Sequence, residues 1–249
     1  MNDTSTPALA PSRVETLKAA LTQWFAEVGV MPQWLDSKPH ELGVVIESKA
    51  WAGIARGLRD RPGLRFDTLI DAAGIDYLHY GQEEWQTHGA TKAGFGRSQQ
   101  PLTATPLAQA SHPARFAVSY QLLSVELNHR LRVRVYAQAG EPPLLESVVG
   151  VWPAANWFER EAFDLYGIFF NNHPDLRRIL TDYGFVGHPF RKDFPVSGHV
   201  EVRYDPALKR VVYEPVSIDP RTLVPRVIRD DHRLDPQLSE KTPTEMRRG

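Results

Sequence analysis

The sequence predicts an α+β fold, with N-terminal helices, a mixed and largely antiparallel sheet, and an extended C-terminal tail. Two patterns indicate this class. Apolar residues recur at helical spacing before residue 60, and strands separated by short turns dominate from residue 115 onward. Helices and strands that occupy different stretches of a chain favour α+β over a doubly wound sheet. Hydrophobic residues make up 42% of the 249 positions, which is enough to build a core.

Two helices are expected before residue 62. The first begins at a capping box formed by Ser12 and Glu15, and Gly29 ends it. A buried strand over 42–47 follows, and Ser48 is expected to cap the second helix. Their apolar faces comprise Val14, Leu17, Leu21, Trp24, Phe25 and Val28 in the first helix and Trp51, Ile54 and Leu58 in the second.

The strands of the sheet follow the second helix. Residues 66–78 are apolar and fit a strand at their end, although a helix over the same residues stays open. An antiparallel unit comes next, and residues 115–126 are its first strand. Residues 130–135 alternate strictly between arginine and an apolar residue, so the apolar residues share the core face and the arginines face solvent. Residues 144–151 fit a third strand of this antiparallel unit.

We expect one α+β domain over residues 1–195 and a second part over 196–249. Residues from about 80 to 113 lack periodicity and predict a surface insertion. Residues 200–216 predict a hairpin. Beyond Asp219, four prolines and a polar composition predict a tail that extends over neighbouring chains, because it cannot bury enough surface to fold alone.

A helix is expected just before residue 167. It would begin at a second capping box, formed by Asn156 and Glu159, and end at Gly167. Glu161 and Asp164, three positions apart, are expected on a solvated or ion-paired face beside Arg160. Prolines after the helix predict that the chain continues as a loop, with at most one helical turn near 176–180.

Composition excludes several functions. Twenty-nine basic and 30 acidic residues give a net charge of −1, which argues against a general nucleic-acid binder. The chain has no cysteine and so cannot hold a disulfide, a Cys-ligated zinc ion or a Cys-ligated iron–sulfur cluster. The first residues lack the regions of a signal peptide, and no apolar run reaches the roughly 18 residues of a spanning helix. We therefore expect a soluble chain, or one tied to a membrane only through a partner.

Residues 159–195 are unusually rich in carboxylates, guanidinium groups, aromatic rings and His-Pro dipeptides. A metal site is one interpretation, with His173, Asp175, Asp182 and His188 as candidate ligands. The favoured alternative is that each His-Pro is a turn whose imidazole binds a backbone group, because no helical metal-ligand spacing accompanies the histidines. Phosphate-binding loops and a GxSxG nucleophile are absent from the sequence. A surface that binds carboxylates of a partner protein is therefore expected.

The same residues carry a family resemblance. EREAFDLYGIFF, HPDLRRIL and GHPFRKDFP resemble the signature of the 30 kDa (C) subunit family of respiratory complex I, the proton-translocating NADH:quinone oxidoreductase. The family pattern has leucine where Phe190 stands, which is a conservative change. FDTLIDAAGIDYL and VEVRYDPALKRVVYEPV are also similar to the family.

The resemblance implies a structural subunit of the hydrophilic arm, with no catalytic, cofactor or metal site of its own. FMN, iron–sulfur clusters, NADH and quinone would be bound elsewhere in the complex, at the cytoplasmic face of the bacterial inner membrane. The implied partner is the quinone-site (D) subunit, which helps to form the quinone pocket. An equivalent subunit of a membrane-bound hydrogenase-like oxidoreductase and a stand-alone metal-dependent enzyme stay open. The expected interface comprises Glu161, Asp164, His173, Asp175, Arg177, Arg178, His188, Phe190, Arg191, Lys192, Asp193 and Phe194.

Overall fold

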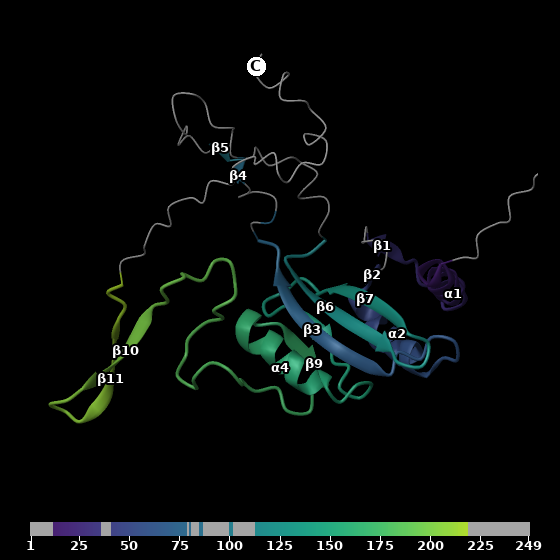
Figure 1. Cartoon of the computed structure of the whole chain (residues 1–249). Helices are drawn as coiled ribbons and strands as arrows, with labels where there is room; N and C mark the ends of the chain where they lie inside the picture. Colours follow the sequence, from purple (N-terminus) through teal and green to yellow (C-terminus); the bar gives the residue numbers. More distant parts are fainter. Residues whose placement is uncertain are drawn as a thin grey trace, which may run out of the picture. The chain divides into compact units, whose positions relative to one another are not determined.

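A computed structural model describes residues 12–35, 41–78, 80 and 113–218, together with the backbone of 85–86 and 100–101. The chain divides into two compact units. One comprises Met1–Tyr80 and Pro106–Gly198, and the other comprises Gly81–Thr105 and His199–Gly249. Most of the predicted insertion and the tail after Asp219 lie outside the described residues. The α+β class is confirmed (Figure 1).

The described part of the larger unit contains ten elements. In chain order they are α1 (Arg13–Glu27), β1 (Gln33–Leu35), β2 (Leu42–Ile46), α2 (Ser48–Asp60), β3 (Thr68–Asp76), β6 (Phe116–Ser124), β7 (His129–Tyr136), β8 (Leu144–Glu146), α4 (Ala155–Tyr166) and β9 (Phe169–Asn171). Five strands form one sheet in the order β1-β2-β7-β6-β3. Only β2 and β7 pair in parallel, so the sheet is mixed and largely antiparallel, as predicted. Strand β3 is an edge strand of this sheet.

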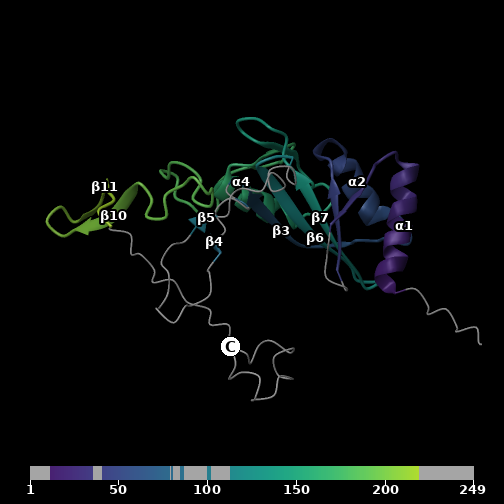
Figure 2. The same ribbon diagram turned by 90° about the horizontal axis from the view of Figure 1, so that it is seen from above.

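The helices pack on the sheet face that carries Tyr120. The ring centroids of Trp51, in α2, and Tyr120 are 4.6 Å apart. Tyr166 of α4 closely approaches Gly74, which shares this face because it is paired with Val118 of β6. Figures 1 and 2 show α1 and α2 at one end of the sheet and α4 near β3 at the other. The core therefore lies between one sheet face and the helices.

The helix boundaries test the capping predictions. Ser12 and Glu15 form the predicted capping box of α1. The prediction for Ser48 is wrong by one position, because Glu47 is the N-cap residue of α2 and makes no side-chain cap. The second capping box is also wrong, because α4 begins after Ala154 and its first N–H groups bond to carbonyls three residues earlier. Gly167 ends α4 with a left-handed φ of 73°, as predicted.

Residues 176–180 form no helical turn, which agrees with the predicted loop. Two further features depart from the predictions. Strand β8 is shorter than expected and keeps one antiparallel bridge, between Leu144 and Gln138, while its ladder is the parallel one with β9 after the α4 crossover. Of the arginines in β7, Arg132 is half-buried and pairs with Glu41, so only Arg130 is fully exposed as expected.

The described part of the smaller unit contains two short antiparallel pairs. Strands β4 (Trp85–Gln86) and β5 (Gln100–Pro101) form one pair. Strands β10 (Val200–Asp205) and β11 (Arg210–Pro215) form the predicted hairpin. Across both units, no described helix is long and apolar enough to cross a membrane.

Candidate partner-binding surface

Helix α4 buries three charged side chains. Glu159, Arg160 and Asp164 are each at most 6% exposed, whereas Glu161 is exposed. Of the two predicted alternatives, a solvated face is therefore wrong for Arg160 and Asp164, whereas the ion-paired one is confirmed for Asp164, which pairs with Arg178. The reason is tertiary: residues 173–194, which we call the pinned segment, fold back over the helix and supply partners for these charges.

Asp164 is the first anchor of the pinned segment. One carboxylate oxygen accepts the backbone N–H groups of Ile179 (3.1 Å), Leu180 (2.8 Å) and Thr181 (2.9 Å). The other accepts the Arg178 guanidinium at 3.2 Å and the Thr181 hydroxyl. Burial by itself would raise the pKa of Asp164, but these hydrogen bonds outweigh it and lower the pKa below 3.8. A single helical carboxylate thus organises a turn of the loop.

Arg178 extends this anchor further along the segment. Besides Asp164, its guanidinium donates to the Thr181 hydroxyl at 2.8 Å and to the carbonyl of Gly187 at 3.1 Å. The planar guanidinium fork can bond several acceptors at once in a way that an ammonium cannot. Two parts of the pinned segment are consequently tied to each other through one side chain.

The C-terminus of α4 is capped by the same segment. The last carbonyls of a helix have no partner within it. Here His188 Nδ1 donates to the carbonyl of Asp164 (2.8 Å), the N–H of Phe190 to that of Leu165 (3.0 Å), and Arg191 Nε to that of Tyr166 (2.6 Å). The Arg191 charge is also favourable at the negative end of the helix dipole.

Asp76, at the end of β3, is the second anchor. Its carboxylate accepts two bonds from Arg115, at 2.9 and 2.8 Å, and the backbone N–H groups of Leu78 (3.0 Å) and Lys192 (2.9 Å). Arg115 also pairs with Asp193 at 3.0 Å. Burial opposes ionisation of Asp76, yet these bonds hold its pKa below the ordinary value. The far end of the segment is therefore fastened to the sheet. The sequence analysis did not single out Asp76 as a functional residue. Its position as an acidic residue within an apolar strand would have indicated a buried, bonded carboxylate.

The two histidines bind backbone groups, as the favoured interpretation predicted. Nδ1 of His173 accepts the N–H of Asp175 at 3.1 Å, so its proton sits on Nε2, which faces the carbonyl of Asn156 at 3.4 Å. Burial lowers the pKa of both His173 and His188. Within the described part of the chain, no group of three His, Cys, Asp or Glu side chains is placed to hold a metal ion.

Glu159 forms a buried polar site beneath the segment. Its carboxylate accepts the Ser147 hydroxyl at 2.6 Å and the N–H of Val148 at 2.8 Å. Nε2 of His173 lies 4.0 Å from it. Burial raises the pKa of Glu159 to about 7, against the two hydrogen bonds, which lower it. Glu159 thereby joins α4 to the loop after β8.

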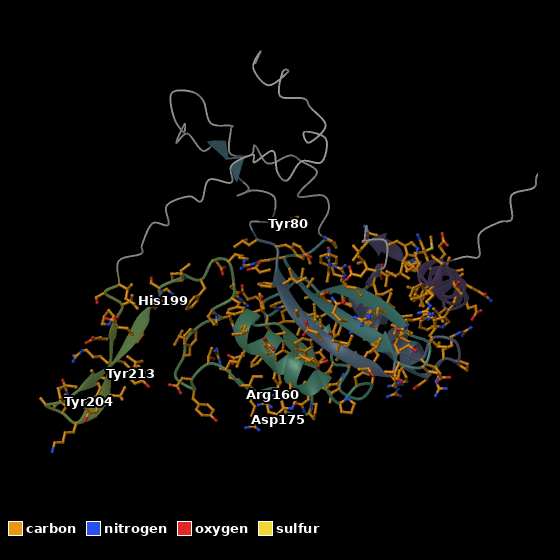
Figure 3. All side chains as sticks on the ribbon, in the orientation of Figure 1. Tyr80, Arg160, Asp175, His199, Tyr204 and Tyr213 are labelled. Atoms are coloured by element: carbon orange, nitrogen blue, oxygen red, sulfur yellow. The ribbon has the colours of Figure 1, made fainter. Side chains whose placement is uncertain are left out.

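The outer side of the pinned segment exposes large apolar side chains. Tyr183 is 92% exposed and Val186 is 83% exposed, and Leu180 and Phe190 are more than half exposed. The predicted interface residues divide accordingly. Glu161, Asp175, Arg177, Phe190, Lys192 and Asp193 are exposed, whereas Asp164 is fully buried and His173, Arg178, His188, Arg191 and Phe194 are half-buried against the rest of the fold. Figure 3 shows Asp175 and Arg160 at the α4 side of the unit.

The hairpin of the smaller unit has two different faces. The pairs Val200–Pro215, Val202–Tyr213 and Tyr204–Val211 make one face wholly apolar. The charged side chains of the hairpin lie on the opposite face, where Arg203 pairs with Glu214 at 2.9 Å. The valine and tyrosine side chains of the apolar face are each more than half exposed (Figure 3 labels Tyr204 and Tyr213). A two-stranded hairpin with an exposed apolar face is marginal in water by itself.

Comparison with known proteins identifies the family. The sequence pattern described as "Respiratory-chain NADH dehydrogenase, 30 Kd subunit" matches residues 44–200. The chain belongs to the 30 kDa subunit family of respiratory complex I. The match begins in β2 and ends in β10, so it includes every strand of the sheet except β1, together with α4 and the whole pinned segment.

Individual relatives agree with this family. The C subunit of NADH-quinone oxidoreductase from Halorhodospira halophila is 59% identical over 196 residues, covering 74% of this chain and 80% of the relative. The same subunit from Legionella pneumophila strain Corby is 50% identical over 220 residues, covering 88% and 92%. As a member of this family, the chain is a subunit of the NADH:quinone oxidoreductase complex.

A solved structure shares the fold. It is described as the membrane-bound sulfane sulfur reductase (MBS), an archaeal respiratory membrane complex. The matching chain is 16% identical with a TM-score of 0.50, and the alignment covers 72% of this chain and 86% of that one. At this identity the likeness concerns the fold alone.

Proposed function

We propose that this chain is a redox-silent structural subunit of the hydrophilic arm of complex I, in which electrons pass from NADH to quinone and drive proton translocation. The absence of cysteine in the sequence supports this role, because iron–sulfur clusters are normally held by thiolates. FMN, the clusters, NADH and quinone then belong to other subunits. The chain lies at the cytoplasmic face of the bacterial inner membrane and is attached through the complex.

The partner is the quinone-site subunit, and it is bound by the outer side of the pinned segment. The observation that carries this proposal is a loop without regular secondary structure whose polar groups bond inward while Leu180, Tyr183, Val186 and Phe190 point outward. Ordering a loop on binding costs conformational entropy, and a loop that is already held does not incur that cost again. Contiguous exposed apolar side chains mark a protein interaction site.

Charges at the edge of this apolar surface add specificity. Arg177 and Asp175 form an exposed ion pair at 2.8 Å, and Lys192 and Asp193 are exposed further along the segment. Exposed pairs contribute little to stability, so these side chains can exchange partners when another protein approaches. Rim charges of this kind steer association and select the partner.

The hairpin and the tail after residue 218 extend the contact to neighbouring subunits. The apolar face around Val202 and Val211 supports this part of the proposal, because covering it would stabilise a hairpin that is marginal alone. The apolar residues in the tail sequence would be buried in the same way; they are Leu223, Val224, Val227, Ile228 and Leu234.

A matched pair of variants tests the surface. Val186→Lys places a charge on the pinned segment, and Val125→Lys makes the same change at an exposed valine, 64% accessible, in the β6–β7 turn. Tagged full-length chains would be purified from detergent-solubilised membranes and the bound subunits quantified by mass spectrometry. The Val186→Lys chain should recover at least about tenfold less of the quinone-site subunit. A tenfold loss corresponds to ~1.4 kcal/mol of binding free energy. Equal recovery with both variants would refute the proposed surface.

A further inference from the structure

A small pocket lies between the edge strand β3 and helix α4. It has a volume of about 220 Å³ and is lined by Asp71, Ala72, Ala73, Gly74, Glu161, Ala162, Leu165, Tyr166 and Phe190. Ligand and cofactor pockets usually enclose roughly 300–1,000 Å³, so this one suits a single side chain better than a cofactor. The pocket also borders the pinned segment, because Phe190 of that segment forms part of its lining.

Two carboxylates give the pocket negative charge. Asp71 comes from β3 and Glu161 from α4. Among the side chains that the structure describes, neither carboxylate has an ion-pair or hydrogen-bond partner. The neighbouring Arg191 is turned elsewhere, with its guanidinium bonded to the carbonyl of Tyr166 and stacked 5.0 Å from the Phe116 ring centroid. The negative charge of the pocket is therefore not neutralised within the described chain.

Two aromatic rings form the other part of the lining. Tyr166 and Phe190 meet edge to face, with ring centroids 5.9 Å apart. Burial raises the pKa of the Tyr166 phenol, and the carboxylates of Asp76 and Glu161 raise it further, which reflects the negative local field. Aromatic faces beside carboxylates favour a cation with a flat, weakly hydrated head group.

We propose that this pocket receives an arginine side chain of a neighbouring complex I subunit. The guanidinium would pair with Asp71 and Glu161, while its aliphatic stem would pack against Ala72, Leu165 and the ring of Phe190. The inference rests on the proposed function, because it assigns a specific contact to the same partner-facing side of the unit. Arginine is preferred to lysine, since its planar fork can serve two carboxylates and stack on a ring at once.

The pocket differs from the anchors in what it contributes to folding. Asp164 and Asp76 have several partners within the chain, so neutralising either one destabilises the isolated subunit. Asp71 and Glu161 have no partner among the described side chains, so neutralising them breaks no ion pair or hydrogen bond within the described chain. The double variant Asp71→Asn/Glu161→Gln should therefore keep or raise the melting temperature of the isolated chain while it weakens assembly.

The first test compares assembly of this double variant with that of Glu47→Gln. Glu47 is an exposed carboxylate at the start of α2, away from the pocket. The pocket variant should co-purify with about tenfold less of the neighbouring subunit, and Glu47→Gln with an unchanged amount. A lower melting temperature of the isolated pocket variant would show that the carboxylates serve folding, and unchanged co-purification would show that no cation binds. Either result overturns the proposal.

The second test identifies the occupant directly. Phe190→p-benzoylphenylalanine keeps an aromatic side chain at the pocket and forms a covalent link to its neighbour under ultraviolet light. In the assembled complex, the linked peptide should belong to another subunit and contain an arginine within a few residues of the link. A peptide of this chain, or one without a basic residue, contradicts the proposal. If Val186→Lys blocks assembly while the pocket variant does not, only the pocket assignment fails.

Discussion

Asp164 and Arg178 form an ion pair of 3.2 Å that joins a buried helix position to an irregular segment. The same carboxylate accepts the next three backbone N–H groups, from Ile179 to Thr181. Such an arrangement gives a loop a defined shape without a hydrogen-bonded ladder of its own. The shape of the proposed binding surface is thus set by a residue that is itself buried beneath it.

Replacing Asp164 should destabilise the isolated chain. Asp164→Asn keeps the volume but removes the charge, which leaves Arg178 and several backbone donors poorly satisfied. We expect a loss of about 3–5 kcal/mol in the free energy of unfolding, as for one partner of a buried ion pair. Because its pKa is lowered from 3.8, the contribution of Asp164 is present above that pH and is lost as the pH falls through the lower folded-state pKa.

Urea denaturation at pH 7 and at pH 3 would measure this loss. Asp175→Asn is the matched control, since Asp175 pairs with Arg177 on the exposed side of the same segment. Exposed pairs of this kind contribute at most about 1 kcal/mol. Equal losses in the two variants would mean that Asp164 is not an anchor.

Gly167 should not tolerate a side chain. Its φ of 73° costs a residue with a Cβ atom about 1–2 kcal/mol. A Cβ atom there would also lie 2.6 Å from His188 Nε2 and 2.5 Å from Arg191 Nη2, so the cap of α4 would have to shift. Gly167→Ala should therefore lower both the melting temperature and the amount of assembled complex. Gly150→Ala, where nothing lies within 4 Å of the added Cβ atom, should change neither. A stable Gly167→Ala chain would contradict the described cap.

Glu159 should make stability depend on pH. Its folded-state pKa of about 7 exceeds the ordinary 4.5, so between these values the folded chain binds more protons than the unfolded chain. The contribution of Glu159 to stability must therefore fall as the pH rises through this window, by roughly 3 kcal/mol at about 1.4 kcal/mol per pKa unit. In Glu159→Gln this component disappears. The free energy of unfolding of both proteins would be measured from pH 4.5 to 8. The wild-type protein should lose stability relative to Glu159→Gln as the pH rises. A difference between the two proteins that stays constant with pH would disprove the raised pKa.

The apolar face of the hairpin should matter for assembly but not for the fold of the larger unit. Val202→Lys places a charge on that face, whereas Glu201→Lys places the same side chain on the opposite face. We expect only Val202→Lys to reduce recovery of the complex, by several-fold, with no change in the melting temperature of either isolated chain. Similar recovery of both variants would exclude this face as a contact.

Local signals predicted much of this protein. The capping box at Ser12, the alternation in residues 130–135 and the glycine at 167 are properties of neighbouring residues, and each indicated the correct element. The signature within residues 159–195 also led to the correct family. Such features are readable because helix ends, strand faces and left-handed positions depend on the nearest few residues.

Only the tertiary structure decided which charges face inward. Arg160 and Asp164 look like solvated helix residues from their spacing, yet both are buried because the pinned segment returns over them. Asp76 receives the N–H of Lys192 from 116 positions further along the chain, a contact that no local pattern announces. The sequence by itself determined most of the elements and the family, but it did not indicate the short strands β1 and β9. Whether each charged side chain is buried or exposed was decided by long-range packing. A carboxylate is stable in the interior only where hydrogen-bond donors from distant parts of the chain surround it.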